Sequence, residues 1–201
     1  LKGTTTDYYI WNHRLLPMIM VFAGRVDLNS VTPPTQKVWA GEGETPVVLV
    51  HTDWTWSDTD KYLGVKGGKA RSSHAHMDAG SFVYDAYGVR WSMDLGRQDY
   101  ATLEVALKAL GGNLWTYTQA SLRWEVSRLN NFFHSTLTVN DSKHRVEGFA
   151  TLEQTINTAT EQGATFDLSP VLEDQVASAM RTVMVVNDKD LKVIDAIRTR
   201  T

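Results

Sequence analysis

The sequence contains no cysteine, so it has neither disulfide bonds nor thiolate metal ligands. Histidine is scarce, with six residues in a chain of 201, so any metal site must draw on a small set of nitrogen ligands together with carboxylates. Proline is also rare, with five residues. Two of these, Pro33 and Pro34, are adjacent and interrupt regular backbone hydrogen bonding, so they indicate a linker.

The chain also lacks an excess of positive charge. Lys and Arg number 20 against 23 Asp and Glu, giving a net charge of -3. This balance argues against bulk electrostatic binding of nucleic acid, so any anionic ligand must be held by a local basic patch. No apolar run approaches the roughly 20 residues that a membrane-spanning helix needs. We therefore expect neither a nucleic-acid partner nor a membrane span.

What is present is ordinary for a folded protein, with 42% hydrophobic and 21% charged residues. Residues 1–30 are apolar with few turn signals and predict helix, interrupted or started at Pro17. Residues 31–46 are interpreted as a linker, within which a β-like pattern begins at Lys37, and residues 47–201 as one β domain. The segment 191–201 still has a strand pattern where the chain stops, so we expect a piece of a longer protein.

The β domain is predicted from short β-branched or alternating runs separated by turn residues. These runs cover residues 38–40, 47–50, 62–66, 81–85, 89–93, 132–139, 150–156, 163–168, 179–186 and 191–197. Hairpin turns are expected at Tyr87–Gly88 and Asn187–Asp188. One helix is predicted over residues 100–110, ended by Gly111. The absence of a strand–helix–strand alternation favours a mainly β fold, an antiparallel sandwich with a short N-terminal helical segment.

A metal site is suggested by His76, Asp94 and His134, which all fall close to predicted strands. Imidazole and carboxylate ligands in combination suit a divalent cation such as zinc. The signal is weak by itself, because a His-x-His pair such as His74 and His76 is more often a surface feature of a strand. His134 also lies beside Phe132 and Phe133 and is open to interpretation as a buried, hydrogen-bonded core histidine.

His74 has a different context, since it follows Lys69 and Arg71 in a loop of small residues that lets a ligand approach the backbone. A histidine in a cationic loop can donate a hydrogen bond to a carboxylate. A second cationic and aromatic group comprises Trp115, Tyr117, Arg123, Trp124 and Arg128. Such groups bind carboxylate or sulfate and stack on sugars, but equally occur as ordinary core and surface residues.

Several of these segments, taken in order, resemble the β-sandwich part of the heparinase II/III family of polysaccharide lyases. The resemblance is carried by Gly67–Gly68, the run from His74 to Phe82, the run from Gly88 to Gly96, Tyr100, Arg128 and the run from His134 to Leu137. It implies a cation site, usually zinc, at His76, Asp94 and His134, and a role for His74 at the carboxylate of the substrate. The sequence departs at Ser135, where the family often has Asn.

The resemblance implies a parent enzyme that cleaves an acidic, uronate-containing polysaccharide or oligosaccharide by β-elimination, in the periplasm or outside the cell. It also implies that residues 1–24 end an α/α-toroid domain, which supplies most of the proton-transfer groups. Lys69, Arg71, Tyr100, Tyr117 and Arg128 are then candidates for substrate binding. The residues leave open a non-catalytic carbohydrate-binding or metal-stapled sandwich, and a metal-dependent hydrolase.

Overall fold

The computed structural model describes residues 16–55 and 57–201, in two compact units divided between Pro34 and Thr35. The first unit contains helix α2 (Leu16–Ala23) and the short 3₁₀ helix η1 (Leu28–Ser30). Helix α2 is almost entirely apolar and has no buried residue. The helix predicted over residues 1–30 is thus present in part, and its portion before Leu16 lies outside the described residues. The assignment of this unit to a toroid stays a prediction.

The second unit is built on two antiparallel sheets, as the sequence predicts. The first sheet contains five strands in sequence order: β1 (Val38–Gly41), β2 (Val47–His51), β3 (Tyr62–Lys66), β4 (Phe82–Ala86) and β5 (Val89–Ser92). The second contains four: β6 (Thr151–Asn157), β7 (Glu161–Asp167), β8 (Ser178–Val186) and β9 (Asp190–Arg198). Strand β1 pairs with β2 throughout its length, so the first sheet begins inside the range expected to be a linker.

Alternation along the strands places one face of each sheet in a shared core. Val48 and Val50 of β2 and Leu63 of β3 are fully buried, as are Phe166 of β7 and Val183 of β8. These residues belong to one hydrophobic cluster, which shows that the two sheets pack face to face. Burying a side chain of this size stabilises the fold by roughly 1.5–3 kcal/mol.

The turns between strands follow the predicted chemistry. Tyr87 and Gly88 both have positive φ, of 55° and 73°, and connect β4 to β5. Asn187 and Asp188 have φ of 54° and 50° and connect β8 to β9. Two successive left-handed residues match the right-handed twist of the flanking strands, which explains Gly88 in the first turn and the short polar pair Asn187 and Asp188 in the second.

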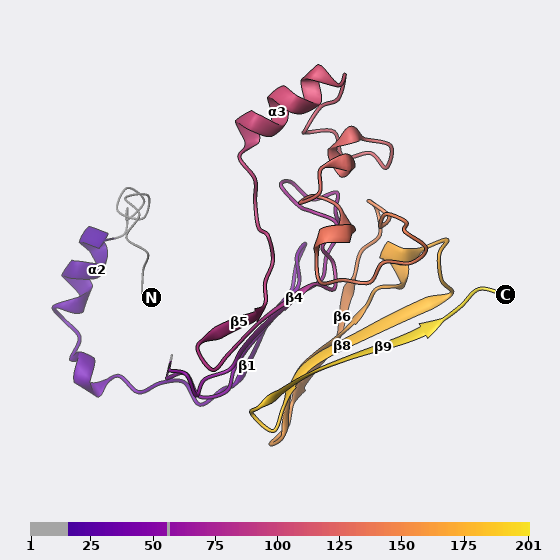
Figure 1. Ribbon diagram of the computed structural model, residues 1–201. Helices are drawn as coiled ribbons and strands as arrows, with labels where there is room; N and C mark the ends of the chain where they lie inside the picture. Colours follow the sequence, from indigo (N-terminus) through magenta and orange to yellow (C-terminus); the bar gives the residue numbers. More distant parts are fainter. Residues whose placement is uncertain (1–15, 56) are drawn as a thin grey trace. The chain divides into compact units, whose positions relative to one another are not determined.

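A second, smaller core lies beside helix α3 (Tyr100–Ala109), which confirms the helix predicted over residues 100–110 and has Asp99 as its N-cap. Leu103 and Leu107 of α3 pack with Met77 and Trp124 in this core. The chain between α3 and β6 carries the 3₁₀ helices η2 (Leu122–Glu125) and η3 (Asn131–Phe133), and η4 (Ser169–Leu172) follows β7. Figure 1 shows α3 and the loops after it gathered at one end of the sheets.

The strand predicted over residues 132–139 is wrong. This stretch contains η3 and an irregular segment, because its side chains take the place of ladder hydrogen bonds. The Ser135 hydroxyl donates to the carbonyl of Phe82 and accepts from its N–H, at 2.7 and 3.0 Å. The Thr136 hydroxyl donates to the carbonyl of Ala79. The segment is therefore fixed against the loop before β4, which contains His76.

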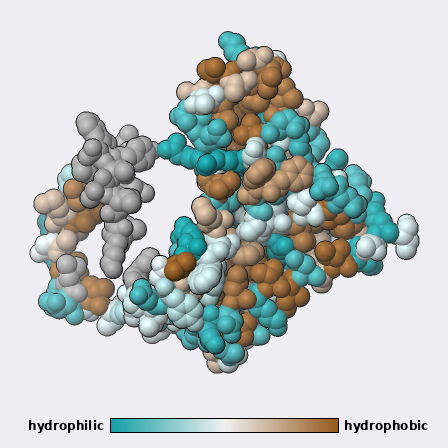
Figure 2. Space-filling model, in the orientation of Figure 1, coloured by the Kyte–Doolittle hydropathy of each residue, from teal (hydrophilic) through white to brown (hydrophobic). Residues whose placement is uncertain are grey.

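The outer surface of the α3 region is hydrophobic in patches, as the space-filling view shows (Figure 2). Val105 and Leu110 are each 73% exposed there. Within the described residues, no helix has the length and apolar character needed to cross a membrane.

Candidate functional site

Three segments bring histidine and carboxylate side chains together at one end of the sandwich. His76 lies in the loop between β3 and β4, Asp94 follows β5, and His134 directly follows η3. The Asp94 Oδ2 and His134 Nδ1 atoms are 2.5 Å apart, and the rings of His76 and His134 have centroids 5.5 Å apart. The structure thus places His134 beside both of the other predicted ligands, with Asp94 hydrogen-bonded to its Nδ1 and His76 next to its ring.

A fourth residue, Asp78, reaches the same cluster. Within the described chain, His76, Asp78 and His134 each offer a ligand atom within 4.8 Å of the other two. Asp78 also accepts a hydrogen bond from the Lys66 ammonium group at 2.7 Å. Asp78 was missed as a candidate in the sequence, although its spacing of two from His76 is the signal that could have found it.

The charges of this cluster are coupled. Burial lowers the pKa of His76 below its ordinary value, against the opposing effect of the Asp78 charge. Burial also acts to lower the pKa of His134, but the hydrogen bond and charge of Asp94 outweigh it and raise that pKa. The same hydrogen bond lowers the pKa of Asp94. A neutral His76 beside an ionised Asp94 is the protonation state in which both groups can bind a cation.

His74 lies two residues earlier but points into a different cluster. Its backbone has φ of 62°, an uncommon conformation for a residue other than glycine. Its N–H donates to the hydroxyl of Tyr117, and its Nδ1 lies 3.0 Å from the hydroxyl of Tyr100. The His74 ring stacks on Tyr100 and meets Trp115 edge-on, with centroids 5.5 and 5.4 Å apart. An exposed histidine is therefore held by three aromatic side chains.

A model of the heparinase II/III-like C-terminal family matches residues 44–201, more than three quarters of the chain. The chain belongs to this family. No curated protein matches the chain in sequence.

Solved structures of heparinases share the fold of this family member. The heparan sulfate lyase HepC from Pedobacter heparinus superposes with a TM-score of 0.61 at 16% identity, covering 97% of this chain and 26% of that one. Heparinase III, the BT4657 gene product, gives a TM-score of 0.59 at 15% identity, with coverage of 95% and 26%. The chain thus spans about a quarter of the length of these structures.

The residues of this heparinase II/III-like chain fit the divalent cation that the family implies. The donor set consists of imidazole nitrogen and carboxylate oxygen atoms, which zinc accepts. Asp94 Oδ2 lies 2.5 Å from His134 Nδ1, which is the ring nitrogen left to face a cation, because Nε2 donates to the backbone carbonyl of Arg128 at 3.0 Å and is oriented from outside the cluster. Such outer contacts are typical of ligating histidines.

The predicted substrate-binding residues have different positions. Tyr100 and Tyr117 contact His74, as described above. Arg128 Nη1 donates to the carbonyls of Leu95 and Arg97, so its guanidinium braces the loop after Asp94. Arg71 forms an exposed ion pair with Glu147, and Lys69 is half-buried in the glycine loop.

Arg123 serves a structural purpose in this arrangement. It is 1% exposed and lies over the rings of Tyr117 and Trp124, with its guanidinium carbon 4.5 and 5.1 Å from their centroids. Its Nη2 donates to the carbonyl of Ala75 at 2.8 Å. Ala75 separates His74 from His76, so one buried arginine fixes the peptide that joins the two clusters.

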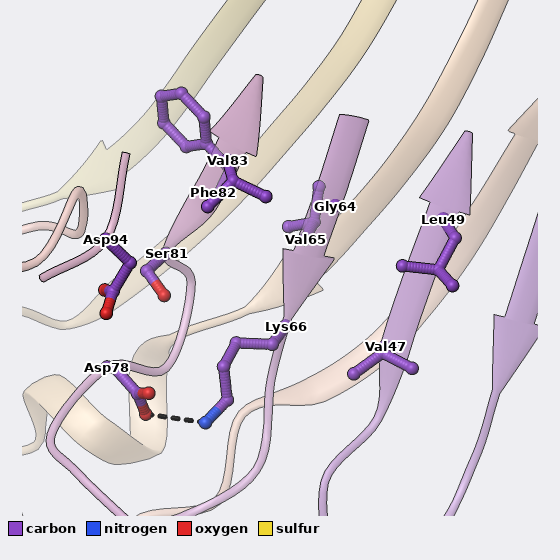
Figure 3. Close-up of a pocket in the computed structure, with 10 residues that line it drawn as sticks. All are labelled: Val47, Leu49, Gly64, Val65, Lys66, Asp78, Ser81, Phe82, Val83 and Asp94. Carbon is purple, nitrogen blue, oxygen red and sulfur yellow. Dashed lines mark hydrogen bonds and ion pairs between the residues drawn. The ribbon is translucent and has the colours of Figure 1, made fainter. Parts of the chain in front are cut away.

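A pocket of about 270 Å³ opens on the outer face of the first sheet, and its lining includes Asp78 and Asp94 of the histidine and carboxylate cluster. Val47, Leu49 and Val83 form its apolar part (Figure 3). The carboxylates of Asp78 and Asp94 lie together at its other end, with Lys66 pointing toward Asp78 (Figure 3). A cation at this end would be reached from the pocket.

Proposed function

We propose that this chain is the β-sandwich part of a polysaccharide lyase that cleaves uronate-containing acidic glycans by β-elimination. The observation that carries the proposal is the position of His74. It is exposed, held by Tyr100 and Tyr117, and separated by one residue from a cluster with cation-binding chemistry. Membership of the heparinase II/III-like family supports the reaction class, and the heparan sulfate lyase fold supports a glycosaminoglycan-type substrate.

The role of His74 follows from the acidity of the substrate. The C5 proton of a uronic acid is weakly acidic because the neighbouring carboxylate is already negative. A hydrogen bond to that carboxylate offsets the charge that develops when the proton leaves, which stabilises the enolate-like transition state. We assign this bond to His74 Nε2. The Tyr100 hydroxyl lies 3.0 Å from Nδ1, and in this proposal it donates to that nitrogen, which leaves the ring proton on Nε2.

His76, Asp94 and His134 would hold a divalent cation, with zinc the best match to the donor set. When bound, it supplies a fixed positive charge that ties the three segments together. In this proposal the three side chains act by orienting the loop that carries His74. This chain spans about a quarter of the length of the heparan sulfate lyase structure that it matches. We therefore place the remaining proton-transfer groups in the part of the parent protein outside this chain. A periplasmic or extracellular location agrees with a polymeric acidic substrate.

The experiment uses the full-length parent and a panel of uronate polymers that includes heparan sulfate and alginate. β-Elimination leaves an unsaturated uronate that absorbs in the ultraviolet, so product is followed directly. We expect signal with at least one polymer and a loss of roughly 10²-fold or more in kcat/KM for His74→Ala. Tyr100→Phe removes the orienting hydroxyl but keeps the ring, and we expect a smaller loss. Absence of an unsaturated product from every polymer refutes the lyase assignment.

A second candidate is a non-catalytic glycan-binding or metal-stapled domain. The exposed ring of Trp115 beside Tyr100 and His74 favours it, because such rings stack on sugars. It predicts glycan binding without elimination, and retention of binding in His74→Ala. Measuring affinity for the same polymers separates the two candidates.

A further inference from the structure

We propose that Asp78 is an oxygen ligand of the cation site and that Lys66 competes with the cation for its carboxylate. The proposal rests on the cation binding included in the proposed function. It adds a ligand to the predicted set of His76, Asp94 and His134. It also assigns Lys66 the part of a charged group that sets how tightly the cation is held.

The distances between the side chains favour Asp78 as a cation ligand and not only as a neighbour of the ligands. A ligand atom of Asp78 lies within 4.8 Å of those of His76 and His134, and these three form the converging group among the described residues. Zinc–ligand distances of about 2 Å place ligand atoms at most about 4 Å apart, so the 4.8 Å limit of this group is only slightly wider than a bound ion requires. A small side-chain adjustment brings the three donors to bonding distance.

Asp94 plays a different part in this geometry. Its Oδ2 lies 2.5 Å from His134 Nδ1, which is the only ring nitrogen left for a cation because Nε2 donates to the Arg128 carbonyl. A cation bound at Nδ1 would replace the proton shared by these two atoms, so Asp94 and His134 would bind the ion together. Among the described residues Asp78 has no hydrogen bond to a histidine, and its carboxylate accepts instead from the Lys66 ammonium group.

Lys66 is the group that a cation must displace. Its ammonium nitrogen lies 2.7 Å from Asp78 Oδ1, and the two side chains are 28% and 15% exposed. Figure 3 shows both at the end of the pocket that also contains Asp94. A lysine and a divalent cation cannot both lie against one carboxylate without strong repulsion. The lysine therefore neutralises Asp78 in the free protein and moves away when the cation binds.

The test measures zinc affinity of the chain by competition with a chromogenic chelator. We expect Asp78→Asn to weaken binding by more than the roughly tenfold to hundredfold that loss of an outer contact typically costs, because a direct ligand is removed. We expect Lys66→Met to tighten binding by about two- to fivefold, because a partly exposed ion pair no longer competes. In the double variant the gain from Lys66→Met should vanish, since the competed carboxylate is absent.

Matched controls separate these effects from general loss of charge. Asp188→Asn removes a carboxylate paired with Lys37, and Lys143→Met removes a lysine paired with Glu125. Neither variant should change zinc affinity, and circular dichroism with thermal unfolding checks that each variant folds.

The outcomes distinguish the two levels of the proposal. Wild-type chain that binds no zinc removes the cation site itself. Wild-type binding that Asp78→Asn leaves unchanged, or that Lys66→Met weakens, overturns the role of Asp78 while leaving His76, Asp94 and His134 as ligands.

Discussion

The buried histidine His144 makes stability depend on pH in a way that can be worked out from its surroundings. Its side chain is in the loop region that follows His134 and is 1% exposed. Its Nε2 donates to the carbonyl of Leu137 at 2.7 Å. Its Nδ1 has no hydrogen-bond partner among the described residues. Protonating Nδ1 would therefore create a buried charge with an unsatisfied N–H, and burial lowers the pKa to about 4.

The sign follows from proton binding in the two states. The unfolded chain binds a proton at this histidine below its ordinary pKa of 6.5, whereas the folded chain does so only near pH 4. Stability from the neutral imidazole is fully present above pH 6.5 and is lost as the pH falls toward 4. A difference of about 2.5 pKa units corresponds to about 3 kcal/mol at roughly 1.36 kcal/mol per unit.

The assay is urea unfolding of the chain at several pH values, compared with His144→Gln. The amide of Gln can still donate to Leu137 but does not titrate, so it keeps the hydrogen bond and removes the pH dependence. Other acidic and basic groups affect both proteins equally, so the difference in free energy of unfolding isolates His144. We expect this difference to shift by about 3 kcal/mol across the window, in favour of the variant at low pH.

Two results would refute the reasoning. One is a difference between wild type and variant that does not change with pH. The other is an NMR titration in which the His144 ring gains its proton near the ordinary histidine range. The functional consequence is local, because Asn131 accepts from the His144 N–H at 3.0 Å and so joins both ends of the segment that contains His134.

Two further substitutions test how the second sheet and the loops hold the site. Arg181→Ala removes a bidentate pair with Asp195 and hydrogen bonds to the carbonyls of Gly80 and Ser135. We expect the free energy of unfolding measured with urea to fall by about 3–5 kcal/mol, and Arg181→Lys to recover part of this loss. A Lys variant as stable as wild type would contradict the bidentate role of the arginine. Gly148→Ala places a methyl group 2.2 Å from the Pro170 carbonyl oxygen, so we expect about 3 kcal/mol of destabilisation by the same measurement. An unchanged unfolding midpoint would show that the backbone shifts to accommodate the methyl group.

The fold could be predicted because its signals are local. Short β-branched or alternating runs identified most of the strands, and turn residues such as Asn187 and Asp188 identified the hairpins. Helix α3 was predicted by its apolar spacing and the glycines after it. The segment after Asn131 could not be predicted, because its pattern is that of a strand while its conformation depends on contacts of Ser135 and Thr136 with residues more than 50 positions earlier.

The candidate site was predicted in composition more than in geometry. The sequence pointed to His76, Asp94 and His134, but His134 lies beside the other two only because the fold brings it to residues 40 and 58 positions earlier. The pattern of two histidines separated by one residue suggests that both face one side of a strand. The positive φ of His74 breaks that alternation and sends the two rings to different partners. No pattern in the sequence indicates that conformation.

The hydrogen bond from Arg123 to Ala75 has a consequence for how inhibition by chelators is read. Only Ala75 separates His74 from His76. Removing a cation from the cluster around His76 would therefore disturb the orientation of His74 through the backbone. Loss of activity on chelation is then expected simply because His74 is displaced when the cation cluster loses its ion. The same loss is expected when the ion never touches the glycan. Dependence on a metal would therefore not show that the metal acts on the substrate as a Lewis acid.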